Sequence, residues 1–310
     1  MAMKLNPNRN VPEAADLTSK EAVLEELGRE ESYLHMVTRR FLKHKMAFFG
    51  LIVFAIFVLV ALLAPVLAPY DPNKIFGDFD ASPSSAHLLG TDQVGRDVLS
   101  RLIFGSQVSL TVGVGAVAIY VAIGIVLGLL AGYFGKWVDM IIMRITDVFM
   151  SFPYFMVILV LVSIVGPSLS NITTVIGLLG WPAIARLVRG SVLSIKEMDY
   201  VKAGVALGYS TPKIIFQHIL PNALAPILVN ATFGVASAII MEASLSFLGM
   251  GVRPPAASWG NMLTEAESIT VLSSQPWLWF PPGLMILLAV LSINFMGDGL
   301  RDAIESQQAK

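Results

Sequence analysis

The strongest constraint in the sequence is the run from Ala47 to Leu67, which contains no charged side chain. A helix needs about 20 mostly apolar residues to cross the hydrocarbon core of a bilayer, and this run is long enough. Charged residues make up only 14% of the 310 residues, against about 25% in an ordinary soluble domain. The sequence therefore predicts a membrane protein, and it argues against a soluble enzyme or a disordered chain.

Five further apolar segments bring the prediction to six membrane-spanning helices, and thus to an all-α polytopic membrane protein. Pro153 is expected to kink the third helix, and Trp181 followed by Pro182 interrupts the fourth. The expected helices cover approximately residues 47–67, 106–133, 141–165, 172–188, 220–249 and 282–296. The predicted divisions are a tail and juxtamembrane segment at 1–46, a first span at 47–68, an outer segment at 69–104, a transmembrane domain at 105–302 and a tail at 303–310.

The basic residues give this arrangement an orientation. If the N-terminus is cytosolic, only Lys74, Arg96, Arg101 and Arg253 fall on the outer side, which leaves 17 of the 21 lysines and arginines inside. Inner loops are normally the basic ones, so we expect both termini in the cytosol. The 46 residues before the first span are too long for a signal peptide, which favours an uncleaved anchor. They include a possible short helix at 19–31 and a basic cluster at 39–45, which is either a plain topology anchor or a contact for anionic lipid.

The chain carries no sign of a catalytic, metal or cofactor site of its own. It has no cysteine, which excludes disulfides and thiol ligands, and its four histidines do not form a zinc-protease pattern. The nearest approach to a phosphate-binding Walker loop, Gly135-Lys136, has Leu130 at the first glycine position and Trp137 after the lysine. A net charge of −1 offers no basic footprint for nucleic acid. Any energy that the protein uses is expected to come from a partner or a gradient.

Three glycines in the second span, Gly124, Gly128 and Gly132, recur at intervals of four. Positions four apart share one face of a helix, and a glycine face lets another backbone approach closely. We therefore expect a tightly packed helix at this face, with no direct role in binding a ligand.

Glu242 is an ionisable residue in the middle of the fifth span, where a charge is costly. Two interpretations stay open for it, a hydrogen bond that serves packing and a position on the path of a substrate. With Ser244 and Ser246 it forms the candidate translocation path. In the third span, Arg144 and Asp147 are three residues apart, which allows an ion pair on one helix face.

The outer segments contain several acidic residues that either face solvent or meet a partner: Asp71, Asp78, Asp80, Asp92, Asp97, Glu265 and Glu267. The spacing of Asp92, Arg96 and Asp97 permits a local ion pair that holds the start of the second span. Trp277, Trp279 and Phe280 are typical of the aromatic belt at a membrane interface.

The longest inner loop, residues 190–221, reads as a helix, a break and a second helix. Gly208 can end the first helix in the left-handed conformation. Ser210 or Thr211 can cap the second helix, and Pro212 suits its first turn. A short exposed helix of small residues can dock in a groove of another protein, although an ordinary amphipathic loop would show a similar pattern. The candidate docking residues are Tyr200, Val201, Lys202, Ala203, Gly204, Ala206, Leu207 and Gly208.

This loop resembles the coupling loop of ABC-transporter permeases, whose pattern is Glu-Ala-Ala, three residues, Gly, and later Leu-Pro. Ala203, Gly208 and the pair Leu220-Pro221 match the pattern. The sequence departs from it at Lys202, where the family favours an acidic residue, and at Gly204, where it favours alanine.

Further motifs, taken in order along residues 39–302, resemble the C-type permease subunit of dipeptide and oligopeptide importers, a group that also includes nickel-chelate and glutathione importers. The motifs are His87 to Asp97, Phe104 to Leu110, Gly180 to Gly190, Leu245 to Pro255, Ser258 to Leu263 and Asn294 to Asp302.

The resemblance implies a type I ABC importer permease fold and a non-enzymatic subunit of a prokaryotic inner or plasma membrane. The implied partners are a B-type permease, two cytosolic ATPases that hold ATP and Mg²⁺, and an extracytoplasmic binding protein that delivers peptide. Nickel chelates or glutathione are alternative substrates within the family. An ion-coupled carrier is the alternative of a different class.

Overall fold

The structure is a computed structural model that describes residues 33–305. The short helix expected at 19–31 lies outside the described residues. Within them the regular structure is helical, apart from two isolated bridges that join Ile75 to Arg96 and Thr91 to Asp97.

The described chain begins with three consecutive helices, α2 (Tyr33–Lys43), α3 (Lys45–Leu62) and α4 (Ala64–Leu67), of which α3 is long and apolar enough to cross a membrane. His44 separates α2 from α3, because its ring nitrogen Nδ1 accepts a hydrogen bond from the backbone N–H of Ala47 at 3.1 Å. This bond satisfies one of the N–H groups that a helix start leaves unpaired. The predicted first span corresponds to α3 and α4 together.

The second span, α5 (Val98–Phe134), begins eight residues before the predicted start at 106. Asp97 is its N-cap, and the carboxylate accepts a hydrogen bond from the backbone N–H of Ser100 at 2.7 Å. The predicted boundary at residue 104 therefore falls inside a helix, since hydropathy does not register the polar first turns that an aspartate cap can start.

The third apolar segment forms two helices, α6 (Lys136–Met150) and α7 (Tyr154–Val165), which are bent by 82° at the break between them. Pro153 lies at this break, where a proline both lacks a backbone N–H and crowds the preceding turn. The predicted change of direction at Pro153 is present, but the segment is divided into two helices and does not form a single kinked one.

The fourth span, α8 (Leu169–Lys196), runs without interruption through Pro182. The predicted interruption at Trp181-Pro182 is wrong, and the helix extends eight residues beyond its predicted end at 188. The next elements are α9 (Asp199–Ala206), α10 (Thr211–Lys213) and a π-helical turn, η1 (Ile214–Ile219), which leads into α11 (Leu220–Phe247).

Three short elements precede the last long helix. They are α12 (Trp259–Met262), η2 (Leu263–Glu267) and α13 (Ile269–Ser274), and they are followed by α14 (Pro276–Glu305). Five helical segments of the described chain are long and apolar enough to cross a membrane, and the bent pair α6 and α7 makes a sixth if it is one span. Counted in this way, the structure agrees with the six predicted spans.

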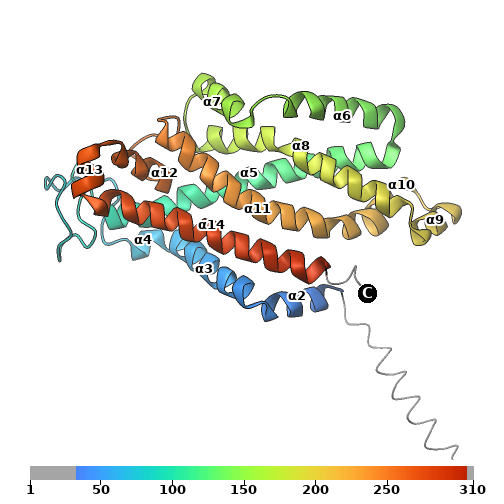
Figure 1. Cartoon of the computed structure of the whole chain (residues 1–310), viewed down its shortest axis with the longest axis horizontal. Coiled ribbons are helices and arrows are strands. Elements are labelled where there is room, and N and C mark those ends of the chain that lie inside the picture. Colours follow the sequence, from blue (N-terminus) through green and yellow to red (C-terminus); the bar gives the residue numbers. More distant parts are fainter. Residues whose placement is uncertain (1–32, 306–310) are drawn as a thin grey trace, which may run out of the picture.

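The helices lie roughly along one axis, and α5 packs against α8 over most of its length (Figure 1). The three glycines of α5 lie at this contact. A Cβ atom added to Gly124 or Gly128 would come within 2.6 Å of Ile184, Ala185 or Val188, and one added to Gly132 within 2.7 Å of Val192. Such distances are impossible for a real side chain, so the approach of the two helices requires glycine.

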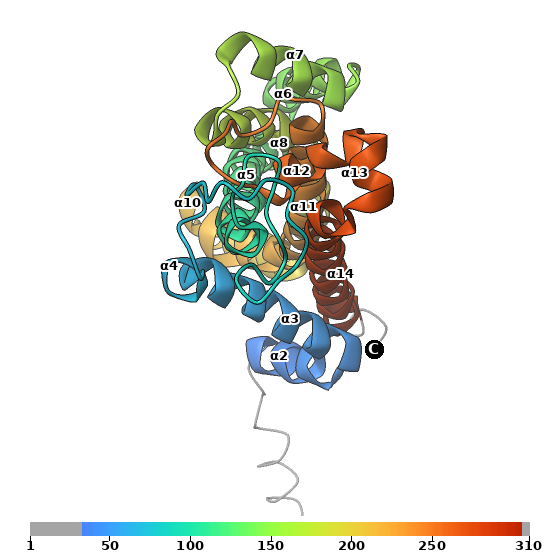
Figure 2. The ribbon, with the colours of Figure 1, turned by 90° about the vertical axis from the view of Figure 1, so that its left-hand side faces the viewer.

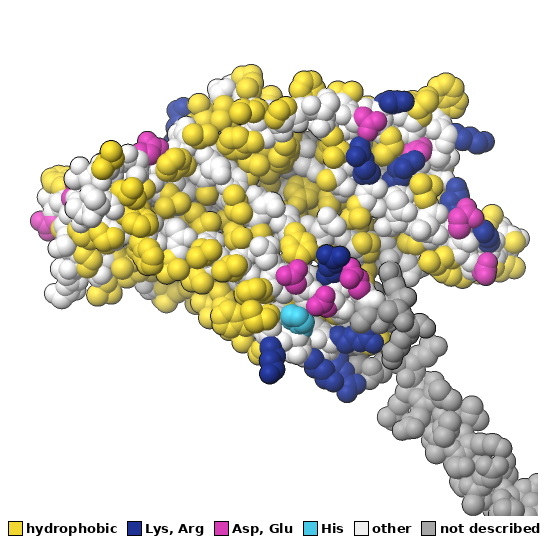
Figure 3. All heavy atoms as spheres, viewed as in Figure 1, with side chains coloured by type: hydrophobic (Ala, Val, Ile, Leu, Met, Phe, Trp, Pro, Cys, Tyr) yellow, Lys and Arg dark blue, Asp and Glu magenta, His cyan; other side chains and the backbone are white. Residues whose placement is uncertain are grey.

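The molecule has two dissimilar ends. One end carries α2, α9 and the end of α14 (Figure 1). Lysine and arginine side chains gather at this end, and a wide hydrophobic surface lies next to them (Figure 3). The opposite end carries residues 69–97, α12 and α13, and the connecting loops lie across the start of α5 (Figure 2). We refer to the first as the basic end and to the second as the loop end.

Candidate functional site

The helix α9 stands at the basic end with much of its surface uncovered. Tyr200 is 43% exposed and Leu207, just after the helix, is 73% exposed, while Val201 and Gly204 are buried against the body. The helix is shorter than predicted, because it ends at Ala206. The docking residues singled out in the sequence therefore lie on α9 and on the turn that follows it.

Gly208 ends α9 with a φ angle of +76°, the left-handed conformation predicted for it. The backbone N–H of Gly208 donates to the carbonyl of Val205, and that of Tyr209 donates to the carbonyl of Gly204, both at 3.0 Å. This pair of bonds is a Schellman motif, which satisfies two of the carbonyls left free at a helix end. The exposed turn is consequently well defined although little else covers it.

Gly204, where the sequence departs from the family pattern, lies under the ring of Tyr209. A Cβ atom added at Gly204 would lie 3.2 Å from that ring. The Tyr209 ring also stacks on His218 with centroids 5.9 Å apart, and the ammonium group of Lys213 lies 3.6 Å from its centre. Glycine at 204 thus leaves space for an aromatic contact that closes the turn.

The second half of the loop differs from the predicted capped helix. Ser210 occupies the N-cap position of α10, yet its side chain makes no capping hydrogen bond, and Pro212 lies in the first turn as expected. The helix continues for only three residues before the chain widens into η1. Such π-helical turns are local insertions that sequence periodicity does not reveal.

Lys202, the other departure from the family pattern, forms an ion pair with Glu197 at 2.9 Å. The hydrogen bond from Lys202 lowers the pKa of the Glu197 carboxyl. An acidic residue at position 202 could not make this bond. The positive charge at position 202 is thus paired with a carboxylate of the same chain.

Glu242 is completely buried in α11. Its carboxylate accepts hydrogen bonds from Ser109 of α5 at 3.2 Å and from Ser246, one turn further along α11, at 2.7 Å. Ser109 in turn accepts a bond from the backbone N–H of Trp259, the first residue of α12, at 3.2 Å. The network joins three elements through a buried carboxyl, which favours the packing interpretation of Glu242.

Ser244, the third residue of the predicted path, points elsewhere. Its hydroxyl donates to the carbonyl of Ile240 in its own helix at 2.8 Å, and it lines a surface pocket on another face of α11. The structure therefore brings Glu242 and Ser246 together and leaves Ser244 apart from them.

The break between α6 and α7 opens onto a pocket of about 410 Å³. The opposite wall belongs to α11, and α5 and α8 complete it. Polar groups are few among its aromatic and aliphatic walls, a composition common in small-molecule sites. The polar residues that line it are Tyr120, Tyr154, Asn230 and Ser237. The sequence reading missed this pocket because it depends on the 82° bend.

Comparison with known proteins places this architecture. Residues 124–310 match the family described as the inner membrane component of binding-protein-dependent transport systems. The chain belongs to this family. Residues 32–86 also match the N-terminal transmembrane domain of oligopeptide transport permease C.

Relatives of this permease span most of both chains. A putative peptide permease protein of Brucella suis biovar 1 is 44% identical over 86% of this chain and 88% of its own length. The dipeptide transport system permease protein DppC of Alkalihalophilus pseudofirmus is 43% identical over 85% and 86%. The glutathione transport system permease protein GsiD of Pectobacterium atrosepticum is 41% identical over 86% and 89%.

A solved structure shows the same fold. The MetNI methionine ABC transporter, in an inward-facing conformation, contains a chain that matches the permease with a TM-score of 0.53 and 23% identity. The match covers 66% of this chain and 96% of that one. The fold is that of a type I ABC importer permease.

At the loop end, the permease contains the ion pair predicted for the start of its second span. Arg96 donates to Asp92 at 2.7 Å, and both side chains are nearly buried. Asp97 accepts from Ser100 and lies 2.9 Å from a ring nitrogen of His87. The sequence signalled Asp92 and Arg96 by spacing alone, whereas the part played by His87 depends on how the loop folds back.

Ion pairs also join α6 to α8 near the basic end of the permease. Arg186 donates to Asp147 at 2.8 Å, and Arg189 contacts Asp139 through two nitrogens. The predicted pair of Arg144 with Asp147 is present but long, at 3.9 Å, and exposed. The stronger partner of Asp147 comes from a different helix, which spacing along one helix could not reveal.

Proposed function

We propose that this permease is one of two transmembrane subunits of an ATP-driven importer of dipeptides and oligopeptides in a bacterial inner membrane. A second, B-type permease completes the translocation path, two cytosolic ATPases bind ATP and Mg²⁺ and hydrolyse the nucleotide, and an extracytoplasmic binding protein delivers the peptide. Both termini and α9 face the cytosol.

The observation that carries the proposal is identity of 43–44% with proteins named as peptide and dipeptide permeases, over 85–86% of this chain. A di/tripeptide permease of Pseudomonas aeruginosa is 43% identical over 86% of it. The glutathione permease is only slightly less similar, and glutathione is itself a small peptide derivative, so it remains the second candidate substrate.

The exposure of α9 supports a role in receiving motion from the ATPases. Tyr200 and Val205 of α9, and Leu207 just after it, present exposed apolar surface at the basic end. A short helix with an apolar face is suited to dock in a groove of another protein. The rigid turn at Gly208 holds this helix at a fixed angle to the body.

The path for the substrate is proposed to run along the face of α11 that lines the pocket behind the α6–α7 break. This face offers Asn230 and Ser237 among large apolar groups. Ser244, which is half-buried on α11, stays a candidate for the same path, whereas Glu242 and Ser246 are assigned to packing.

The decisive experiment reconstitutes the chain with its second permease, ATPases and binding protein in vesicles and measures the uptake of labelled di- and tripeptides. Uptake is expected only with hydrolysable ATP and the binding protein. Uptake that follows a membrane potential without ATP would instead identify an ion-coupled carrier. Competition by glutathione and by nickel chelates ranks the alternative substrates.

A further inference from the structure

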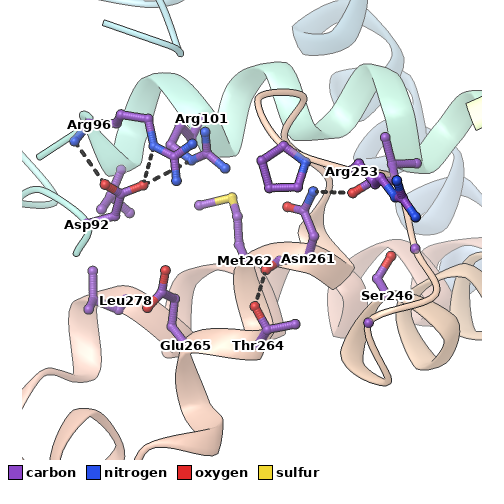
Figure 4. A pocket seen from close by; sticks show the side chains of 15 residues that line it. Asp92, Arg96, Arg101, Ser246, Arg253, Asn261, Met262, Thr264, Glu265 and Leu278 are labelled. Atoms are coloured by element: carbon purple, nitrogen blue, oxygen red, sulfur yellow. Dashed lines mark hydrogen bonds and ion pairs between the residues drawn. The ribbon is translucent and has the colours of Figure 1, made fainter. Parts of the chain in front are cut away.

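A cavity of about 230 Å³ lies at the loop end, between the start of α5, the segment 246–265 and the start of α14 (Figure 4). It is much larger than the roughly 30 Å³ that one water molecule occupies in the liquid and smaller than the roughly 300–1,000 Å³ of sites for drug-sized ligands. Its size suits the end of a small molecule rather than a whole one.

Arg101 forms one wall of the cavity with hydrogen-bonding capacity to spare. The side chain is nearly buried, and its Nε lies 3.4 Å from Asp92. Its Nη1 contacts the carbonyls of Pro72 and Pro255 at 3.4 and 3.3 Å, both at the long end of the range for such bonds. No hydrogen bond of its Nη2 is found within residues 33–305. Asp92 is already held more closely by Arg96, at 2.7 Å, so one carboxylate serves two guanidinium groups.

Arg253 and Glu265 complete the charged lining. Arg253 is exposed at the mouth of the cavity and forms no ion pair with another described residue. Glu265 projects from η2 on the wall facing Arg96 and Arg101 (Figure 4), yet it pairs with neither of them. Burial, and then the negative charges of Asp92 and Asp80, raise the pKa of the Glu265 carboxyl. Three guanidinium groups, those of Arg96, Arg101 and Arg253, thus line the cavity with two carboxyl groups, those of Asp92 and Glu265.

The charges that line the cavity indicate what kind of ligand it can bind. A cavity with a surplus of positive charge and spare N–H donors favours an anion. Guanidinium groups match the planar geometry of a carboxylate in particular, because they can donate two parallel hydrogen bonds to it.

We propose that the cavity binds the terminal carboxylate of a small peptide, with Arg253 contacting it at the mouth and Arg101 inside. Glu265 opposes this binding, which keeps the peptide from being held too tightly for release. The proposal rests on the proposed function in taking peptides as the substrate, and it adds a subsite for one end of the substrate within this subunit.

The test measures binding of L-alanyl-L-alanine and of its C-terminal amide to the purified complete transporter in lipid nanodiscs, by calorimetry. The free acid is expected to bind roughly tenfold more tightly than the amide, as a charge-assisted hydrogen bond would give. Arg253→Gln should remove most of this difference, and Glu265→Gln should increase the affinity for the acid. Opposite effects of two substitutions in one cavity cannot arise from general misfolding.

Arg144→Gln is the matched control, because Arg144 is an exposed arginine with one long ion pair far from the cavity. It should leave both affinities unchanged. Equal affinity for acid and amide, or shifts of the same sign in the two cavity variants, would overturn the proposal. So would an Arg253→Gln variant that binds peptide normally but loses affinity for the binding protein, since the cavity would then receive an acidic side chain of that protein.

Binding and transport are read separately. Uptake of the same dipeptide by the wild-type transporter, driven by ATP, tests the proposed function and does not depend on the cavity. If the peptide is taken up but the free acid and the amide bind equally well, the subsite is rejected and the proposed function stands. If the free acid binds more tightly than the amide but is not taken up, the subsite stands and the transport of that peptide is rejected.

Discussion

At the loop end, Asp92, Asp97 and Arg101 are each at most 5% exposed. Asp92 pairs with Arg96 and Arg101, and Asp97 contacts His87 and Ser100. At the basic end, the ion pair of Lys202 with Glu197 leaves both side chains more than half exposed. The same kinds of residue are used at both ends, but only those at the loop end are enclosed by the fold.

The difference in burial implies a difference in rigidity. Removing one partner from a buried pair leaves an unsatisfied charge, which costs several kcal/mol, whereas an exposed pair is worth about 0–1 kcal/mol. We therefore expect substitutions at the loop end to lower the stability of the subunit, and substitutions at the basic end to leave stability nearly unchanged while they impair coupling to partners.

The largest effect on stability is expected for Trp259→Ala. Trp259 is fully buried, its ring meets Phe57 edge-on at 5.4 Å, and its indole N–H donates to the carbonyl of Leu102 at 3.1 Å. Truncation should cost about 3–5 kcal/mol, since it leaves a cavity and removes the hydrogen bond to Leu102. Thermal unfolding in detergent measures the loss. The control is Trp137→Ala, at a tryptophan that is 73% exposed, which should change the stability little.

The next largest effect is expected for Asp97→Ala. This change removes the cap of α5 and the partner of His87 together, and it should cost about 2 kcal/mol or more. The matched control is Asp71→Ala in the same loop, because Asp71 also accepts a backbone hydrogen bond, from Asn73 at 2.8 Å, but at an exposed site. Equal losses for the two variants would remove the contrast between buried and exposed polar groups.

Gly208→Val tests the basic end. Valine is strained at a φ of +76°, by about 1–3 kcal/mol, so the turn after α9 should rearrange locally. The unfolding temperature of the subunit should fall little, while ATP-driven uptake falls strongly. Gly208→Asn should retain more uptake, because asparagine tolerates this conformation better. Unchanged uptake in the valine variant would reject the docking role of α9.

Glu265→Gln should change how stability depends on pH. Because the folded pKa of Glu265 is raised, the folded protein binds more protons than the unfolded chain between the two pKa values, and stability falls as the pH rises through that window. The window begins at about 4.3, the ordinary value for glutamate. With glutamine at position 265, stability should fall less as the pH rises, and thermal unfolding measured from pH 5 to 7.5 checks this. Glu267→Gln, at an exposed neighbour, serves as the control.

The smallest effect is expected for Gly204→Ala. The new methyl group would meet the Tyr209 ring at 3.2 Å, and the ring can shift because the turn is exposed. Stability should change by less than about 1 kcal/mol, which is the usual range for such sites. A loss comparable to that of Asp97→Ala would show that the turn after α9 is as firmly packed as the loop end.

The sequence predicted what depends on neighbours along the chain. Long apolar segments located the spans, and glycine at 208 indicated a left-handed helix end. It did not predict what depends on distant residues. The stronger partner of Asp147 comes from α8, and the cavity joins Arg101 to Glu265, which are 164 positions apart. The early start of α5 was missed for another reason, because its cap Asp97 is local but hydropathy does not register a polar first turn. The uninterrupted path of α8 through Pro182 likewise depends on packing against α5 rather than on local propensity.

The close contact of α5 with α8 has a mechanical consequence. At Gly128 the two backbones are so near that an added methyl group would overlap a carbonyl oxygen of α8, which leaves no slack for the helices to slide past each other. The C-terminal end of α8 leads directly into α9, and the N-terminal end of α5 carries Asp97 and Arg101 at the opposite end, about 55 Å away along a helix of 37 residues. We therefore expect the pair to move as one stiff unit, so that under the proposed coupling a push on α9 would tilt the mouth of the charged cavity.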